Sequence, residues 1–246
     1  MNISVIATAQ QAQDIDFSGK TAVVIDVLRA TSVITTALDN GAQEVIPVKT
    51  IEEAQKLYSI SNPSSTLRSG ERNSLKIDGF DLSNSPLEYK KKVVEGKTVI
   101  ITTTNGTNAI NNIKGADEVM LACFRNAVAV ADYIFGRLSD HSSRDVVIVC
   151  AGTQGRFSLD DGLCAGMLIE LLKQKNEVET DDLGLLLNRF YNDNKDNLFG
   201  ALSGCFHLKR LFTLGFYDDI RFCLQTNSVT TIPVLRNGRI IKLQNL

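Results

Sequence analysis

The chain has 246 residues, of which 43% are hydrophobic, enough for one large α/β domain or for a domain with an appendage. Its net charge of −2 and its lack of Trp give no support for binding nucleic acid. No apolar run reaches the roughly 20 residues of a membrane span. The N-terminus has no secretory signal, and 5 scattered cysteines without a CxxC pair predict free thiols in a cytoplasmic protein.

The first sixty residues alternate between strand and helix. The second strand is apolar without alternation, as in a sheet that is covered on both faces. Thr50 and Glu53 form a capping box that opens the second helix. The pattern predicts strands over 3–7, 20–27 and 44–48 and helices over 31–40 and 50–58. This alternation is typical of a mostly parallel sheet.

A second β-α-β pass resembles the first. Gly-Lys-Thr opens a strand in both passes, and Gly-Ala-x-Glu-Val follows both helices. The turn at 26–32 and the turn at 103–107 therefore occupy equivalent positions. We expect both turns at the same edge of the sheet, where ligands bind in open α/β folds.

The rest of the chain divides into a loop, two more strands with helices, and a tail. Residues 61–85 predict a long polar loop over the site, and residues 118–123 and 145–150 predict strands. Asn237-Gly238 between apolar runs predicts a final hairpin after several short helices. We expect a three-layer α/β/α fold with a mostly parallel or mixed sheet, a core at 1–172, and the segment 173–246 packed on it.

Polar side chains gather where the strands end. Asp26 is either a metal ligand or catalytic carboxylate, or a turn residue that pairs with Arg29. Arg29 precedes two hydroxyls at a helix start, which suits bidentate binding of phosphate, sulfonate or carboxylate. The polar turn at 103–107 either binds an anion or caps its helix.

Cys150 and Arg156 stand at the spacing of the cysteine-dependent phosphatase loop. Val149 occupies the place of the usual His, which favours a buried structural thiol at Cys150. Neither histidine has the neighbours of a catalytic triad. We therefore expect His207 to be a packing or surface residue of the tail, and His141 to lie in a polar loop.

Seven motifs of the chain recur together and in order in one known family: they lie at 24–31, 70–72, 79–86, 102–107, 124–127, 150–153 and 157–161. On these motifs the sequence resembles the Mg2+-dependent 2-phosphosulfolactate phosphatases. The resemblance implies hydrolysis of 2-phospho-3-sulfolactate, or of a related phosphorylated 2-hydroxy acid, to 3-sulfolactate and phosphate. In organisms that make coenzyme M, this is a step towards it. Mg2+ is the implied cofactor, a small anionic phosphate ester is the implied substrate, and a homo-oligomer is left open.

We assign site roles by combining this implication with the strand-end pattern. Catalytic roles are expected of Asp26, Arg29 and Asp161. Metal binding is expected within the set Asp26, Glu71, Asp81 and Asp160. Substrate binding is expected of Thr31, Arg72, Thr104, Asn105, Gly106, Thr107, Arg125, Asn126 and Arg156. The nucleophile, water or a side chain, is left open. Two alternatives also stay open: a cysteine-dependent phosphatase that uses Cys150 and Arg156, and a non-catalytic anion-binding protein of the same fold.

Overall fold

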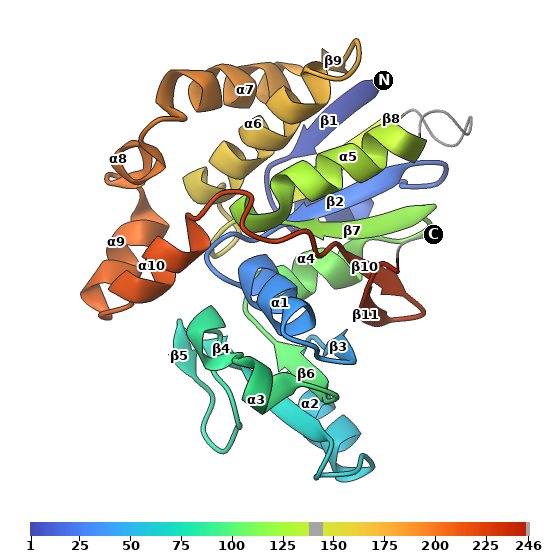
Figure 1. The fold of residues 1–246 in the computed structure, drawn as a ribbon, viewed down its shortest axis with the longest axis vertical. Coiled ribbons are helices and arrows are strands. Elements are labelled where there is room, and N and C mark those ends of the chain that lie inside the picture. Colours follow the sequence, from blue (N-terminus) through green and yellow to red (C-terminus); the bar gives the residue numbers. More distant parts are fainter. Residues whose placement is uncertain (138–144, 245–246) are drawn as a thin grey trace.

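The computed structural model describes residues 1–137 and 145–244 of the chain (Figure 1). His141 lies outside these described residues. Within them, strands form one mixed sheet in the order β5-β4-β6-β3-β11-β10-β7-β2-β8-β1-β9. The strands are β1 (Asn2–Ile6), β2 (Thr21–Ile25), β3 (Glu44–Pro47), β4 (Thr66–Arg72), β5 (Leu75–Lys76), β6 (Thr98–Thr102), β7 (Glu118–Ala122), β8 (Asp145–Cys150), β9 (Glu179–Thr180), β10 (Pro233–Arg236) and β11 (Arg239–Lys242). The predicted α/β class with a mixed, mostly parallel sheet is confirmed.

The C-terminal hairpin lies inside the sheet and joins two half-sheets. β10 pairs with β11 through the turn at Asn237 and Gly238, as the sequence predicts. β10 is also antiparallel to β7, and β11 is antiparallel to β3. The strands β4, β6 and β3 are parallel to one another, and so are β7, β2, β8 and β1. The antiparallel hairpin therefore makes the two half-sheets run in opposite directions.

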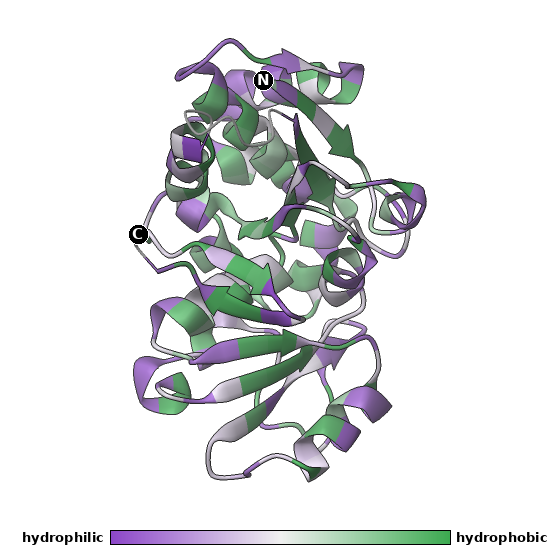
Figure 2. Cartoon of the chain, turned by 90° about the vertical axis from the view of Figure 1, so that its right-hand side faces the viewer, coloured by the Kyte–Doolittle hydropathy of each residue, from purple (hydrophilic) through white to green (hydrophobic). Residues whose placement is uncertain are grey.

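Helices cover both faces of the sheet. Helices α1 (Ala30–Asp39) and α4 (Gly106–Asn112) pack with Val24 of β2 and with Ile101 of β6 in one apolar cluster, so they cover both half-sheets. Helices α5 (Ala127–Arg137) and α6 (Leu159–Lys173) pack against the opposite face, where Val23 and Ile25 of β2 point. The helices are α1 (Ala30–Asp39), α2 (Ile51–Ser59), α3 (Lys91–Val94), α4 (Gly106–Asn112), α5 (Ala127–Arg137), α6 (Leu159–Lys173), α7 (Asp182–Asn194), α8 (Leu198–Leu202), α9 (Phe206–Thr213) and α10 (Tyr217–Cys223). Figure 2 shows the hydrophobic strands between these layers.

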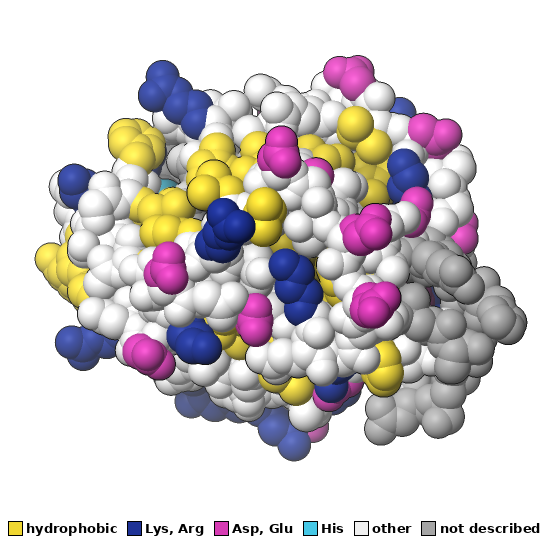
Figure 3. Space-filling model, turned by 90° about the horizontal axis from the view of Figure 1, so that it is seen from above, with side chains coloured by type: hydrophobic (Ala, Val, Ile, Leu, Met, Phe, Trp, Pro, Cys, Tyr) yellow, Lys and Arg dark blue, Asp and Glu magenta, His cyan; other side chains and the backbone are white. Residues whose placement is uncertain are grey.

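The face of the molecule seen from above carries dispersed charges of both signs (Figure 3). Figure 3, a view onto the end of the molecule where α7 lies, shows hydrophobic side chains among acidic and basic ones. Leu186 of α7 and Phe206 of α9 are 61% and 63% exposed. No helix of the described residues is long and apolar enough to cross a bilayer.

The segment predicted as a long loop contains a strand. β4 (Thr66–Arg72) pairs in parallel with β6 from Thr66 to Gly70, and its last two residues pair with β5, which turns back on it. The sequence of β4 has one large apolar residue, Leu67, among polar neighbours, so neither the alternation nor the apolar run of a strand is present. Pairing with the buried strand β6 therefore determines its conformation, which is an effect of tertiary structure.

The two β-α-β passes are arranged reciprocally. β2 pairs with β7, and β3 pairs with β6, so each pass supplies one strand to each half-sheet. The turns match in detail. The Thr31 hydroxyl accepts from the amide and donates to the carbonyl of Asp26, and the Thr107 hydroxyl does the same with Thr103. The predicted equivalence of these turns is therefore visible in their hydrogen bonds.

The starts of α1 and α4 touch at Gly106. A Cβ atom placed on Gly106 would lie 2.5 Å from the Cβ of Ala30 and 2.6 Å from Oδ2 of Asp26. Glycine is therefore needed here because the two turns approach each other closely, and its φ is not in the left-handed region. This contact brings the carboxyl ends of β2 and β6 together.

We expect Gly106→Ala to lower the free energy of unfolding by about 1–3 kcal/mol, since the methyl group must separate two packed turns. Urea denaturation measures this change. Gly204→Ala is the control, because a Cβ at Gly204 meets no atom within 4 Å. Equal stability of the two variants would contradict the close contact of the turns.

Candidate active site

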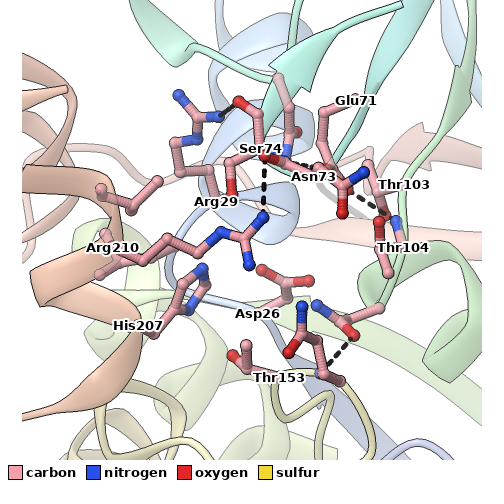
Figure 4. Close-up of a pocket in the computed structure, with 15 residues that line it drawn as sticks. Asp26, Arg29, Glu71, Asn73, Ser74, Thr103, Thr104, Thr153, His207 and Arg210 are labelled. Carbon is pink, nitrogen blue, oxygen red and sulfur yellow. Dashed lines mark hydrogen bonds between the residues drawn. The ribbon is translucent and has the colours of Figure 1, made fainter. Parts of the chain in front are cut away.

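A polar cavity lies where the ends of the two half-sheets meet α9 (Figure 4). The turn after β2 contributes Asp26, Leu28 and Arg29, the turn after β6 contributes Thr103, Thr104 and Asn105, and the turn after β8 contributes Thr153 and Gln154. Glu71, Asn73 and Ser74 come from the β4–β5 hairpin. Asn84 and the α9 residues His207, Arg210 and Leu211 complete the lining.

Asp26 is a buried carboxylate that faces this cavity. One of its oxygens accepts from the Ala30 amide at 3.0 Å, which fixes the side chain at the start of α1. Burial raises the pKa of Asp26 to about 6, the positive charge of His207 opposes the shift, and the charges of Asp160 and Glu71 add to it. A cation in the cavity would therefore stabilise the ionised form of Asp26.

Glu71 brings a second carboxylate to the cavity from the other half-sheet. Its two oxygens accept from the amides of Thr104 and Ser74, both at 2.7 Å. The side chain is 7% exposed. Glu71 therefore ties the β4–β5 hairpin to the turn after β6 and still faces the cavity.

Arg29 lines the cavity with its charge already balanced. Its guanidinium forms an ion pair with Asp219 of α10 and donates to the Ser74 carbonyl at 2.9 Å. The guanidinium carbon lies 4.1 Å from the centre of the Phe216 ring. These contacts fix Arg29 between the helical tail and the β4–β5 hairpin.

Helix α9 carries two further nitrogen-bearing side chains into the cavity. Arg210 extends its guanidinium towards the hairpin and donates to the Asn73 carbonyl at 3.1 Å (Figure 4). No carboxylate of the described residues forms an ion pair with Arg210. His207 lies one turn earlier on the same face, and its ring points across the cavity towards Asp26 (Figure 4).

The prediction for His207 as a packing or surface residue needs correction, and Arg210 was not identified from the sequence. His207, Arg210 and Leu211 have the i, i+3, i+4 spacing of one helix face, beside the buried Leu208. This spacing was the available signal. It is weak, because charged residues next to an apolar stripe more often lie in solvent.

Asp160 and Asp161 lie behind the cavity and do not line it. The two oxygens of Asp161 accept from the amides of Val27 and Gly152, both at 2.9 Å, so Asp161 joins the turns after β2 and β8. Asp160 has no exposed surface and faces His207. Asp161 therefore has a structural position where we expected a catalytic one, and Asp160 is placed beside the histidine.

Most of the other expected site residues lie elsewhere. Asp81 forms an ion pair with Arg68 on the surface. The Arg72 guanidinium donates to the Thr102 hydroxyl and to the Glu71 carbonyl. The Arg125 guanidinium lies against the Phe222 ring and donates to the hydroxyls of Thr36 and Ser228. Asn126 accepts from the Cys123 amide. Thr31 and Thr107 hold their turns, and Gly106 packs between them. The expected residues that line the cavity are Asp26, Arg29, Glu71, Thr104 and Asn105.

The cysteine-dependent alternative has no support in the geometry. Cys150 is fully buried in the sheet, and burial, together with the charges of Asp161 and Asp160, raises the pKa of its thiol well above the usual range. Arg156 is exposed and does not line the cavity. The loop between them therefore does not bring a thiolate and a guanidinium to one anion.

The donors in the cavity suit a hard cation. In the described part of the chain, no group of three or more His, Cys, Asp and Glu side chains is arranged around one point. Asp26 and Glu71 line the cavity, and so does Asn84, whose buried Oδ1 has no hydrogen-bond partner among these residues. Mg2+ prefers oxygen ligands and is often held by one or two carboxylates together with waters and substrate phosphate. These oxygens fit such an ion.

The fold and the cavity define an α/β protein with a polar cavity at the carboxyl ends of its strands, the place where ligands bind in open α/β folds. Comparison with known proteins is more specific. The sequence profile described as 2-phosphosulpholactate phosphatase matches residues 6–238. The chain belongs to the 2-phosphosulfolactate phosphatase family, which confirms the resemblance found in the sequence.

Three relatives illustrate the extent of the similarity, and each is named "Probable 2-phosphosulfolactate phosphatase". The protein of Caldanaerobacter subterraneus subsp. tengcongensis is 49% identical over 238 residues, which cover 97% of both chains. That of Clostridium tetani is 41% identical and covers 98% of this chain and 100% of its own. That of Thermotoga petrophila is 46% identical over 222 residues, 90% of this chain and 92% of its own.

Proposed function

We propose that the protein is a Mg2+-dependent phosphatase that hydrolyses 2-phospho-3-sulfolactate, or a closely related phosphorylated 2-hydroxy acid, to the free hydroxy acid and phosphate. The observation that carries the proposal is that one cavity contains two buried carboxylates and a guanidinium that forms no ion pair with the described residues. Asp26 and Glu71 offer oxygens to a metal, and Arg210 offers a charge to an anion. Similarity over nearly the whole chain to proteins of that name supports the choice of substrate.

Asp26 and Glu71, with the Asn84 amide oxygen, would hold the Mg2+ ion. Bound there, the ion would neutralise phosphoryl oxygens as negative charge shifts during hydrolysis. Asp26 is held in place by the Ala30 amide, and Glu71 by the amides of Thr104 and Ser74. These hydrogen bonds keep both side chains oriented before a ligand arrives, which is the arrangement that metal and phosphate binding requires.

The substrate would bring three anionic groups, a phosphate, a carboxylate and a sulfonate, into a cavity with a limited number of positive charges. Arg29 is neutralised by Asp219, and His207 faces Asp160. Arg210 therefore has the guanidinium that is free to pair with an acidic group of the substrate. The hydroxyl and amide groups of Thr104 and Asn105 add neutral hydrogen-bonding capacity.

A panel of phosphate esters tests the proposal. We expect release of phosphate from 2-phosphosulfolactate with Mg2+ and slower release from 2-phospholactate, which lacks the sulfonate. We expect little release from glycerol phosphate, which lacks both the carboxylate and the sulfonate. Binding of these compounds without release of phosphate would instead support the non-catalytic alternative.

We expect Arg210→Ala to raise the KM for 2-phosphosulfolactate by about 10- to 100-fold, because a charged hydrogen bond contributes roughly 1.5–3 kcal/mol. Steady-state kinetics of phosphate release gives KM and kcat separately. Lys209→Ala is the matched control, since Lys209 is exposed on the same helix and does not line the cavity. A KM for Arg210→Ala equal to that of the control would exclude Arg210 from substrate binding.

A further inference from the structure

Hydrolysis of an alkyl phosphate leaves an alkoxide, which is a poor leaving group at neutral pH. Such a reaction is accelerated when a positioned side chain protonates the leaving oxygen as the bond to phosphorus breaks. The proposed substrate is an ester of this kind, so the cavity needs a proton donor. The carboxylates Asp26 and Glu71 are already assigned to a cation.

His207 is placed to be that donor. Its side chain is 11% exposed and lies on the cavity face of α9. Nδ1 of the ring is 3.4 Å from Oδ2 of Asp160, and both atoms are buried without a hydrogen-bond partner among the described residues, so each is the nearest charged group available to the other. With Nδ1 directed to Asp160, Nε2 is the nitrogen left for the cavity, where the ring points towards Asp26 (Figure 4).

Asp160 is itself held rigidly. It has no exposed surface, and its second oxygen accepts from the Ser158 hydroxyl. The Thr153 hydroxyl in turn bonds to the Ser158 hydroxyl at 3.1 Å. A buried carboxylate that faces one imidazole nitrogen fixes the tautomer and orientation of the ring and stabilises its protonated form. Burial alone would lower the pKa of His207, but the negative charge of Asp160 beside the ring outweighs this effect and raises it.

The other charged groups that face His207 act on its pKa in opposite directions. Asp26 at the end of β2 favours the protonated ring, and Arg29 at the start of α1 disfavours it. Arg210 extends from α9 itself and is directed to the β4–β5 hairpin. The contact with Asp160 is therefore the specific feature that sets the state and orientation of the ring.

We propose that His207 is the general acid of the reaction and that Asp160 is the residue that positions it. The inference depends on the proposed phosphatase function. The bond between phosphorus and the oxygen on carbon 2 breaks with its electron pair remaining on that oxygen, which takes the proton from Nε2 of His207. Over the full turnover a water oxygen becomes bonded to phosphorus, and one proton of that water returns to the imidazole.

The test compares 2-phosphosulfolactate with its analogue in which sulfur replaces the bridging oxygen. A thiolate leaves without protonation, so the analogue does not need the general acid. We expect His207→Gln to lower kcat for the oxygen ester by about 100- to 10,000-fold. The loss for the sulfur ester should be at least 10 times smaller, and Asp160→Asn should show the same selectivity with a smaller loss. The Lys209→Ala variant is the control for changes in α9.

Equal losses of kcat for the two esters would overturn the proposal, because a purely structural defect affects both substrates alike. Full activity of His207→Gln on the oxygen ester would overturn it directly, and so would failure of the unchanged protein to hydrolyse the sulfur ester. A different result would be that the unchanged protein releases no phosphate from the oxygen ester and none from the sulfur ester. That result would refute the proposed phosphatase function and this inference with it.

Discussion

Replacing Asp26 with Asn is expected to lower the rate of phosphate release from 2-phosphosulfolactate by at least about 100-fold. The side chain is 6% exposed, lines the cavity, and lies near both Glu71 and His207. Asparagine can still accept the hydrogen bond from the Ala30 amide, so the start of α1 should be preserved. The expected loss therefore comes from the missing negative charge and its effect on metal and phosphate binding. Phosphate release under saturating substrate measures it.

Asp81→Asn is the matched control for this experiment. Asp81 belongs to the same predicted set of metal ligands, but it is 35% exposed, pairs with Arg68 and lies outside the cavity. We expect this variant to keep nearly full activity. An Asp26→Asn variant with near-normal turnover would remove Asp26 from the catalytic machinery, provided that thermal unfolding shows both variants to be folded.

Chelation of divalent cations is expected to have an equally large effect. EDTA should reduce phosphate release to background, and added Mg2+ should restore it, because Asp26, Glu71 and Asn84 present oxygen donors to one cavity. Mg2+ should also raise the Tm of the unchanged protein, since a ligand that binds the folded state at 100 times its Kd stabilises it by about 2.7 kcal/mol. Asp26→Asn should lose most of this shift.

The same experiment separates the metal-dependent mechanism from the cysteine-dependent one. Activity that persists in EDTA and is lost in Cys150→Ser would contradict the metal-dependent account. We expect Cys150→Ser to keep its response to Mg2+, because Cys150 is buried in the sheet away from the cavity lining. Its measurable effect should be on stability, since a hydroxyl replaces an apolar thiol in the core.

The sequence predicted the fold well where the local signal was strong. The apolar strand before Asp26 and the Asn237-Gly238 turn both formed as expected. The strand β4 was missed because its residues lack a strand pattern and take their conformation from pairing with β6. The position of the hairpin inside the sheet could not be predicted from the sequence either, because it depends on long-range strand pairs such as Ile240 with Val45.

The candidate site was predicted in part, for a physical reason. Residues at strand ends, such as Asp26 and Thr104, could be proposed because ligands in open α/β folds bind where the strands end. The two residues belong to half-sheets that run in opposite directions, and they reach one cavity because the starts of α1 and α4 touch at Gly106. Arginines were harder to place, because a long side chain can point in several directions from one backbone position. Arg72 and Arg125 instead satisfy backbone and hydroxyl groups outside the cavity.

The contribution of α9 was the main omission. His207 and Arg210 are at least 100 residues from the motifs at 70–107 along the chain, and no strand-end pattern connects them. They reach the cavity because Leu208 and Leu211 of α9 pack into the apolar core. Identifying them from the sequence would have required knowing where the helical tail docks.

The central claim is that a divalent cation and the phosphate of the substrate meet in the cavity between Asp26 and Glu71. A crystal structure of the protein grown with Mn2+ and inorganic phosphate tests this most directly, because the anomalous signal locates the cation. We predict Mn2+ bound by Asp26 and Glu71, with phosphate as a further ligand on the side of His207 and Arg210. Mn2+ and phosphate bound at another place, with this cavity empty, would contradict the account.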